Sequence, residues 1–300
     1  MYVGIDHGTT AMRFACETGE FKVSRSDARD FVAGDLERLC PLDDIEGIAV
    51  CYSMGDGISA ITPIEHVENR GVVSQAGAGE HIGGGTRVFD AIAESGIPAV
   101  VIPGIHRNSP TDPRFKAYSH QTSPEKIGIA YEACRLLGTD AVVCDASSNT
   151  VTLLVSGGRI AGAIDACIFA PGTRHGALDV DAIRRIDAGS CTANEAFLAA
   201  GVDITMPPDL RIPTLAMFAA MEMAGMRILN PAAKAALAGS CAPVIAAEVE
   251  RLLGIPVCIF DEWCASRGLW KIARDVFKGA PSILGIPVDS RAAARSNSLI

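Results

Sequence analysis

Two stretches of this sequence place an acidic residue at the end of an apolar run and follow it with small residues. The residues concerned are Asp6, Gly8, Thr9 and Thr10 in the first stretch and Asp145, Ser147, Ser148 and Asn149 in the second. A turn of small residues after a strand exposes backbone N–H groups and hydroxyls to a phosphate, while the acid can hold Mg²⁺ or orient water. Each turn is weak evidence alone, because hairpin turns favour Gly, Asp and Asn for steric reasons.

The pattern around the two acids is the same, which strengthens the prediction. Each acid ends a strand that is followed by a tight turn, a second strand, another turn and a third strand. The acids lie 145 − 6 = 139 residues apart, about one domain length. A unit that recurs at this interval indicates two similar domains facing each other, so that both turns would grip one polyphosphate.

A third candidate element is LAGSCAPVIAAEVERLLG, in which Gly239 and Ser240 end a strand and open a helix. This turn leaves room for a flat ring near the backbone; the alternative is an ordinary strand-to-helix turn. GAGEHIGGG does not satisfy the dinucleotide fingerprint, and no GxxxxGK[ST] occurs, so neither a dinucleotide fold nor a P-loop is supported.

The elements that must position these turns can be read from periodicity and helix signals. A helix is predicted over 123–137, where Ser123 can cap, Pro124 suits the first position and Glu125 the first turn. The linker between the domains is expected near this helix. Helices are also predicted over 179–187, 192–201 and 212–229, followed by strand, helix, strand and helix between 235 and 277.

The region from Pro213 to Leu229 is apolar and rich in methionine. The simpler interpretation of Met217, Met221, Met223 and Met226 is core filling rather than a metal or cofactor site. The same region could serve as a homodimer interface, and the sequence does not decide between the two.

Composition limits the class of protein. The 300 residues are 49% hydrophobic, enough apolar surface for two cores, and their many Gly and Pro residues favour an α/β protein. A net charge of −9 argues against nucleic acid and anionic membranes as partners. No apolar run could span a membrane, and the chain opens with a strand-like MYVGID, so we expect a soluble cytoplasmic protein. Ten cysteines without a CxxC pair predict reduced, mostly buried thiols.

Three motifs together resemble the actin-like ATPases, the superfamily of sugar kinases, acetate kinase and Hsp70. YVGIDHGTT resembles their phosphate-1 motif, CDASSNT stands where their phosphate-2 motif falls, and LAGSCAPVIAAEVERLLG looks like their adenosine motif. The resemblance implies an α/β fold of two ribonuclease-H-like (actin-like ATPase) domains, with ATP and Mg²⁺ in the cleft between them. We expect the N-terminal domain over 1–135 and the C-terminal domain over 136–300.

The middle of the chain is most similar to acetate and butyrate kinases. YSHQTSPEKIGIAYEACRLLG would place His120 on the histidine that stabilises the transferring phosphoryl group, and APGTRHGALDVDAI would place Arg174 on their catalytic arginine. IFDEWCASRGL makes Glu262 the match for their magnesium-associated glutamate, beside Asp6 and Asp145. The alternatives are that His120 is a cap or a structural hydrogen-bond partner and that Arg174 is only solvated. Their second turn carries a glycine, whereas the turn at 147–149 has none.

The whole chain most closely resembles the methanogenesis marker protein 12 family of methanogenic archaea, whose reaction is unassigned. Three hypotheses follow. The first is a phosphotransferase that moves phosphate from ATP to a small carboxylate. The second is a nucleotide-driven switch or assembly factor that acts on a protein partner, and the third is a protein that keeps the fold but binds another ligand in the cleft.

Overall fold

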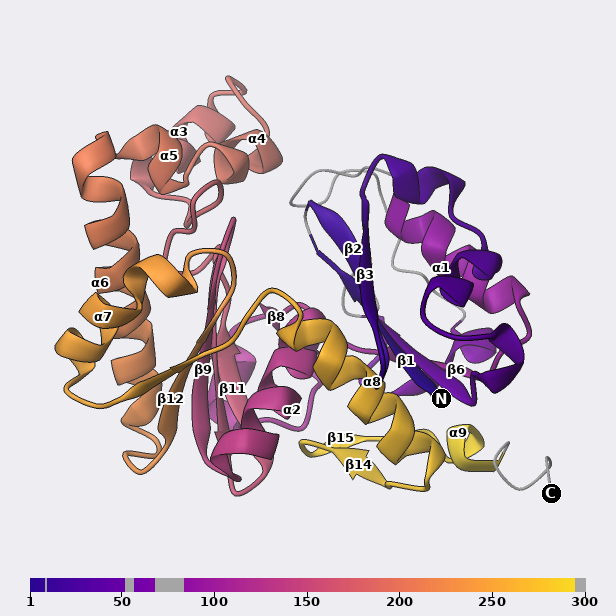
Figure 1. Cartoon of the computed structure of the whole chain (residues 1–300). Coiled ribbons are helices and arrows are strands. Elements are labelled where there is room, and N and C mark those ends of the chain that lie inside the picture. Colours follow the sequence, from indigo (N-terminus) through magenta and orange to yellow (C-terminus); the bar gives the residue numbers. More distant parts are fainter. Residues whose placement is uncertain (9, 52–56, 68–83, 295–300) are drawn as a thin grey trace.

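The structure is a computed structural model of the chain and describes residues 1–8, 10–51, 57–67 and 84–294. Two sheets form its framework, each with helices packed on its faces (Figure 1). The first sheet has the strand order β3 (Glu20–Ser24), β2 (Ala11–Ala15), β1 (Tyr2–His7), β4 (Gly47–Cys51), β6 (Ala99–Ile102) and β5 (Thr62–Pro63). The second has the order β11 (Arg159–Ile164), β10 (Thr150–Ser156), β9 (Ala141–Ala146), β12 (Lys234–Ala238) and β13 (Val257–Ile259).

The two sheets repeat one topology, as the sequence predicted. In each, a central strand pairs antiparallel with the next strand of a meander and parallel with a later strand on its other side. β1 is the central strand of the first sheet and β9 that of the second. Asp6 lies near the end of β1 and Asp145 near the end of β9, so the two acids occupy equivalent places.

Six helices lie where the sequence predicted them, over 123–137, 179–187, 192–201 and 212–229 and twice between 235 and 277, whereas the helices Gly84–Glu94, Val202–Thr205 and Ser290–Ala294 were not predicted. The described helices are α1 (Gly84–Glu94), α2 (Glu125–Leu137), α3 (Val180–Asp187), α4 (Ala193–Leu198), α5 (Val202–Thr205), α6 (Pro208–Arg227), α7 (Ala242–Leu253), α8 (Cys264–Phe277) and α9 (Ser290–Ala294). Two short antiparallel strand pairs lie outside the large sheets, β7 (Ile105–His106) with β8 (His120–Thr122) and β14 (Ser282–Ile283) with β15 (Ile286–Pro287). The predicted Ser123 cap of α2 is wrong, because the Ser123 hydroxyl donates to Glu125 Oε1 at 2.6 Å instead.

Helices α2 and α8 lie between the two sheets, where Figure 1 shows them side by side. α8 packs on β1 and β4 of the first sheet, while α2 packs on β9 and β10 of the second. One core therefore runs from Ile102 through Leu269 to Leu153. The predicted division at residues 135 and 136 remains a prediction, and it must accommodate a helix from the C-terminal part that packs on the first sheet.

Glycines allow α8 to approach its neighbours backbone to backbone. A Cβ on Gly268 would lie 1.9 Å from the carbonyl oxygen of Gly128 in α2. A Cβ on Gly4 in β1 would lie 2.2 Å from the carbonyl oxygen of Ser266. No side chain larger than hydrogen fits at these crossings, so the sheets are joined through close contacts of main chain.

Separate apolar clusters cover the outer faces of the sheets. α1 covers the first sheet, and α6 and α7 cover the second (Figure 1). Met223 and Met226 of α6 are buried there, as predicted for core residues. Met217 and Met221 are 42% and 49% exposed, so the core interpretation is wrong for these two. All ten cysteines are free, in agreement with the sequence, and no helix in the described ranges is long and apolar enough to cross a membrane.

Candidate functional site

Asp6 is buried at the carboxyl end of β1, directly across the hairpin from Arg13 on β2. The guanidinium Nη1 of Arg13 lies 3.6 Å from Asp6 Oδ2, whereas Oδ1 has no hydrogen-bond partner among the described residues. Burial raises the pKa of Asp6 to about 7, the charges of Glu125 and Asp145 add to the effect, and Arg13 and Lys126 oppose it. Asp6 therefore changes its charge near neutral pH.

The first turn is built around Gly8. A Cβ on Gly8 would lie 2.6 Å from Arg13 Nη1 and 2.7 Å from the carbonyl oxygen of Ala11, so only glycine fits. Arg25 Nη1 donates to the Gly8 carbonyl at 3.4 Å, and the backbone N–H of Arg25 donates to the Thr10 carbonyl at 3.2 Å. Thr10 is exposed, and Thr9 lies outside the described residues.

His7 precedes this turn and is buried with no hydrogen-bond partner on either ring nitrogen among the described residues. Burial, with help from the Arg25 charge, lowers the pKa of His7 to about 3, so the ring is neutral at physiological pH. A neutral ring beside Asp6 adds no positive charge to the site.

Asp145 occupies the equivalent place in the second sheet and has a different basic partner. Lys126 Nζ, from the first turn of α2, lies 2.8 Å from Asp145 Oδ2 and 2.8 Å from Glu125 Oε1. Asp145 Oδ1 has no partner among the described residues. Gly239 lies against this oxygen, since a Cβ there would be 2.2 Å from Oδ1, and its φ of 91° also favours glycine. Ser240, the next residue, precedes α7.

The second turn is held by the loop that carries Arg174. The backbone N–H of Thr173 donates to the Ser147 carbonyl at 2.9 Å, and that of His175 donates to the Ser148 carbonyl at 3.0 Å. His175 Nδ1 also hydrogen-bonds Asn149 Oδ1. These contacts place Arg174 next to the turn and restrain a turn that has no glycine of its own.

The three predicted catalytic residues are each engaged in the described structure. His120 Nε2 lies 2.9 Å from Asp165 Oδ2, and the Arg174 backbone N–H donates to the Ser148 carbonyl at 3.2 Å. Glu262 accepts from Arg13 and from Lys22, both at 3.1 Å. Arg13 thus links Glu262 to Asp6.

No three carboxylate, histidine or cysteine side chains in the described ranges converge as a ready metal site. The unpaired oxygens of Asp6 and Asp145 still suit a hard divalent cation that takes its remaining ligands from phosphate and water. Sequence reasoning missed Arg13 and Lys126. Strand register would have pointed to Arg13, because it faces Asp6, whereas the contact of Lys126 with Asp145 depends on how α2 packs.

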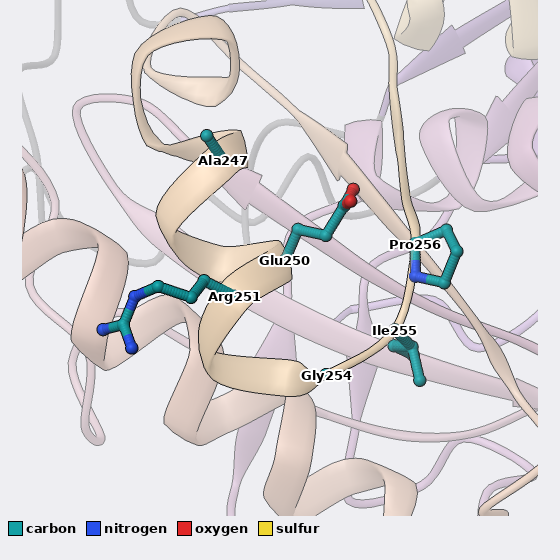
Figure 2. Close-up of a pocket in the computed structure, with 6 residues that line it drawn as sticks. All are labelled: Ala247, Glu250, Arg251, Gly254, Ile255 and Pro256. Carbon is teal, nitrogen blue, oxygen red and sulfur yellow. The ribbon is translucent and has the colours of Figure 1, made fainter.

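A hollow beside α7 is not part of this site (Figure 2). It is lined by Ala247, Glu250, Arg251, Gly254, Ile255 and Pro256 at the C-terminal end of α7. Gly239 precedes the other end of α7, roughly 18 Å away for a helix of 12 residues. Glu250 already accepts a hydrogen bond from the Val257 backbone N–H at 3.1 Å, and Arg251 is paired with the Glu248 carboxylate at 2.6 Å.

Solved structures place this architecture in a known class. The chain superimposes on a propionate kinase from Francisella tularensis with a TM-score of 0.53 at 12% identity, covering 89% of this chain and 91% of that one. An inorganic polyphosphate/ATP-glucomannokinase from Arthrobacter sp. strain KM gives 0.51 at 13% identity, covering 90% and 97%. The chain has the actin-like ATPase fold, as its motifs predicted.

Sequence relatives define the family. A UPF0285 protein of Methanosarcina mazei is 46% identical, with 96% of this chain and 99% of the relative covered. Another, from Methanocaldococcus jannaschii, is 54% identical over 66% of this chain and 63% of its own length. No family model matches the chain. The protein belongs to the UPF0285 family of methanogenic archaea.

Proposed function

We propose that the protein binds ATP with Mg²⁺ between its two hairpin turns and acts as a nucleotide-driven switch or assembly factor. One observation carries the proposal. The equivalent central strands β1 and β9 each carry a buried carboxylate one residue before their end, and each carboxylate has one oxygen without a hydrogen-bond partner among the described residues. Buried polar oxygens are normally satisfied, so these two favour a ligand between the turns.

Each part of the nucleotide has residues suited to it. Asp6 and Asp145 would hold the magnesium ion, which when bound neutralises negative charge on the phosphates. Backbone and hydroxyl groups of the turns would bind the phosphates through Gly8, Thr9, Thr10, Ser147, Ser148 and Asn149. Gly239 and Ser240 would lie beside the nucleoside, because the main chain there carries no Cβ at Gly239.

One observation favours a switch over a phosphotransferase. A kinase would use His120 at the transferred group and Glu262 at the metal, whereas here His120 Nε2 contacts Asp165 Oδ2 at 2.9 Å and Glu262 is held in ion pairs with Arg13 and Lys22. The relatives belong to methanogens, which supports a role in methanogenesis and our proposal that this family is the methanogenesis marker protein 12 family. The product of nucleotide binding would be a conformation presented to a partner protein.

Isothermal titration of MgATP into the purified protein tests the proposal. We expect micromolar binding that Asp145→Asn weakens at least about tenfold, because it removes a metal-binding charge. Glu250→Gln, at the far end of α7, is the matched control and should bind as the wild type does. No binding by the wild type at millimolar MgATP would reject the proposal and favour a different ligand in the cleft.

A second candidate function is phosphoryl transfer from ATP to a small carboxylate, as in acetate and butyrate kinases. It is supported by the position of Arg174 beside the second turn, where a guanidinium could neutralise charge on a transferring phosphoryl group. One of the solved structures with the same fold is a propionate kinase, which agrees with this candidate. ADP release with acetate, propionate and butyrate as acceptors, lost in Arg174→Ala, would support transfer. ATP binding without acceptor-dependent turnover would favour the switch.

A further inference from the structure

The ammonium group of Lys126 is an internal cation at the site. Its side chain is 7% exposed, and Nζ contacts carboxylate oxygens of Asp145 and Glu125 at 2.8 Å each. Burial would lower the pKa of Lys126, but the two carboxylates outweigh it and hold that pKa well above its usual value. Lys126 therefore stays charged where it lies.

The position of the Lys126 ammonium group matters for metal binding at Asp145. Of the two Asp145 carboxylate oxygens, Oδ2 is taken by Lys126, and Oδ1 lies against Gly239 without a partner among the described residues. A divalent cation at Oδ1 would share one carboxylate with an ammonium ion. Like charges at such a separation repel strongly in a site with little water.

The corresponding ion pair in the first sheet is longer. Asp6 is 3.6 Å from Arg13, beyond hydrogen-bond range, and Arg13 is drawn toward Glu262 at 3.1 Å. Val151, not a basic residue, faces Asp145 across its hairpin. The second acid therefore depends on α2 for its counter-charge, and α2 is also the helix that packs against α8 between the sheets.

We propose that Lys126 competes with a divalent cation for Asp145 and thereby lets metal bind firmly only together with nucleotide phosphates. This rests on the proposed function, since it assigns Asp145 to the metal of a nucleotide site. Without phosphate, Lys126 neutralises Asp145. When a polyphosphate enters, its charge attracts both the ammonium group and the metal, and the carboxylate can serve the metal.

The experiment measures two affinities that should move in opposite directions. Lys126→Met keeps an unbranched side chain one heavy atom shorter than that of lysine and removes the charge. We expect Mn²⁺ without nucleotide, followed by electron paramagnetic resonance, to bind at least about tenfold tighter than to wild type. ATP in the presence of a chelator should bind at least about tenfold more weakly, because the acidic site then faces the phosphates without Lys126. General structural damage would weaken both.

Lys271→Met is the matched control. Lys271 of α8 pairs with Glu132 of α2 in the same helix contact, at a place away from Asp145, so neither affinity should change. If Lys126→Met does not fold, Glu125→Gln with Lys126→Met removes one carboxylate and the ammonium together and carries the same expectation for Mn²⁺. An Mn²⁺ affinity equal to that of wild type in a folded variant overturns the inference.

The two proposals can fail separately. MgATP binding by wild type with no effect of Lys126→Met on Mn²⁺ would reject the role of Lys126 and leave the nucleotide site intact. A tenfold gain in Mn²⁺ affinity in a protein that binds no nucleotide would reject the proposed function and leave the competition at Asp145 standing.

Discussion

Asp6 and Arg13 face each other across the first hairpin, with Nη1 3.6 Å from Oδ2, whereas the equivalent acid Asp145 faces Val151 and takes its counter-charge from Lys126 of another element. The repeat therefore preserves the acids but not their partners. Asp6 is left only partly compensated, which agrees with its pKa of about 7. The two halves of the site should respond differently to pH and to substitution.

The charge of Asp6 predicts a pH dependence for MgATP binding. Because burial raises the pKa of Asp6 to about 7, the carboxylate is increasingly protonated as the pH falls below 7 and can no longer bind metal. We expect affinity to fall roughly tenfold per pH unit below 7 and to level off above 8. Titrations from pH 5.5 to 8.5 would measure it.

Asp6→Asn is the control for that profile, since ATP itself changes charge in the same range. The variant should bind more weakly and lose the part of the pH dependence that belongs to Asp6. Identical slopes for wild type and variant would assign the profile to the nucleotide and not to this carboxyl group.

The crossing of α2 and α8 predicts a large loss of stability in Gly268→Ala. The new methyl group would lie 1.9 Å from the Gly128 carbonyl oxygen, which is main chain and cannot move aside alone. We expect the free energy of unfolding measured in urea to fall by about 1–3 kcal/mol relative to wild type. An added Cβ at Gly225 on α6 would meet no neighbouring atom within 4 Å, so Gly225→Ala should instead stabilise the protein by about 0.5–1 kcal/mol through helix propensity. Equal effects of the two substitutions would contradict the close crossing.

Glu222 predicts that stability declines as the pH rises. This carboxyl is buried on α6, where its Oε1 accepts from the Ala170 backbone at 3.2 Å, and burial raises its pKa to about 8. The folded state binds the proton more tightly than the unfolded state. The stabilising contribution of protonated Glu222 is therefore fully present below about pH 4.5 and is lost as the pH rises toward 8.

Glu222→Gln should remove that dependence, because glutamine stays neutral. We expect the variant to gain on the order of 1–3 kcal/mol relative to wild type between pH 5 and pH 8 in urea unfolding. Glu248→Gln, at an exposed ion pair with Arg251, is the control and should alter stability by less than about 1 kcal/mol. If the free energies of unfolding of wild type and Glu222→Gln differ by the same amount at pH 5 and at pH 8, then Glu222 is already charged in the folded protein.

The contact of His175 with Asn149 predicts energetic coupling between the second turn and the loop that carries Arg174. His175 is buried and stacks on Phe197 with ring centroids 4.9 Å apart, so its ring is held in place while Nδ1 meets Asn149. Asn149→Ala and His175→Ala should each cost about 1–3 kcal/mol. The double variant should cost less than their sum by about 0.5–3 kcal/mol, and strict additivity would exclude coupling.

Local pattern was enough to predict much of the fold. Apolar runs that end in Asp6 and Asp145, each followed by a turn and two more strands, predicted the paired meanders, and register follows directly once those turns are identified. The helix over 123–137 was predicted to within two residues at its start, although the Ser123 cap was wrong. Close local contacts decide these features, so neighbouring residues carry the information.

The partners of the site residues were decided by tertiary structure. Lys126 reaches Asp145 because α2 packs on the second sheet, and Arg13 meets Glu262 across 249 residues of chain. Nothing in the sequence around Lys126 distinguishes a buried ion pair from a solvated lysine in a first helical turn. The sequence by itself determined which strands end in acids; packing of distant elements determined which charges those acids face, since Coulomb interactions depend on distance and burial and not on separation along the chain.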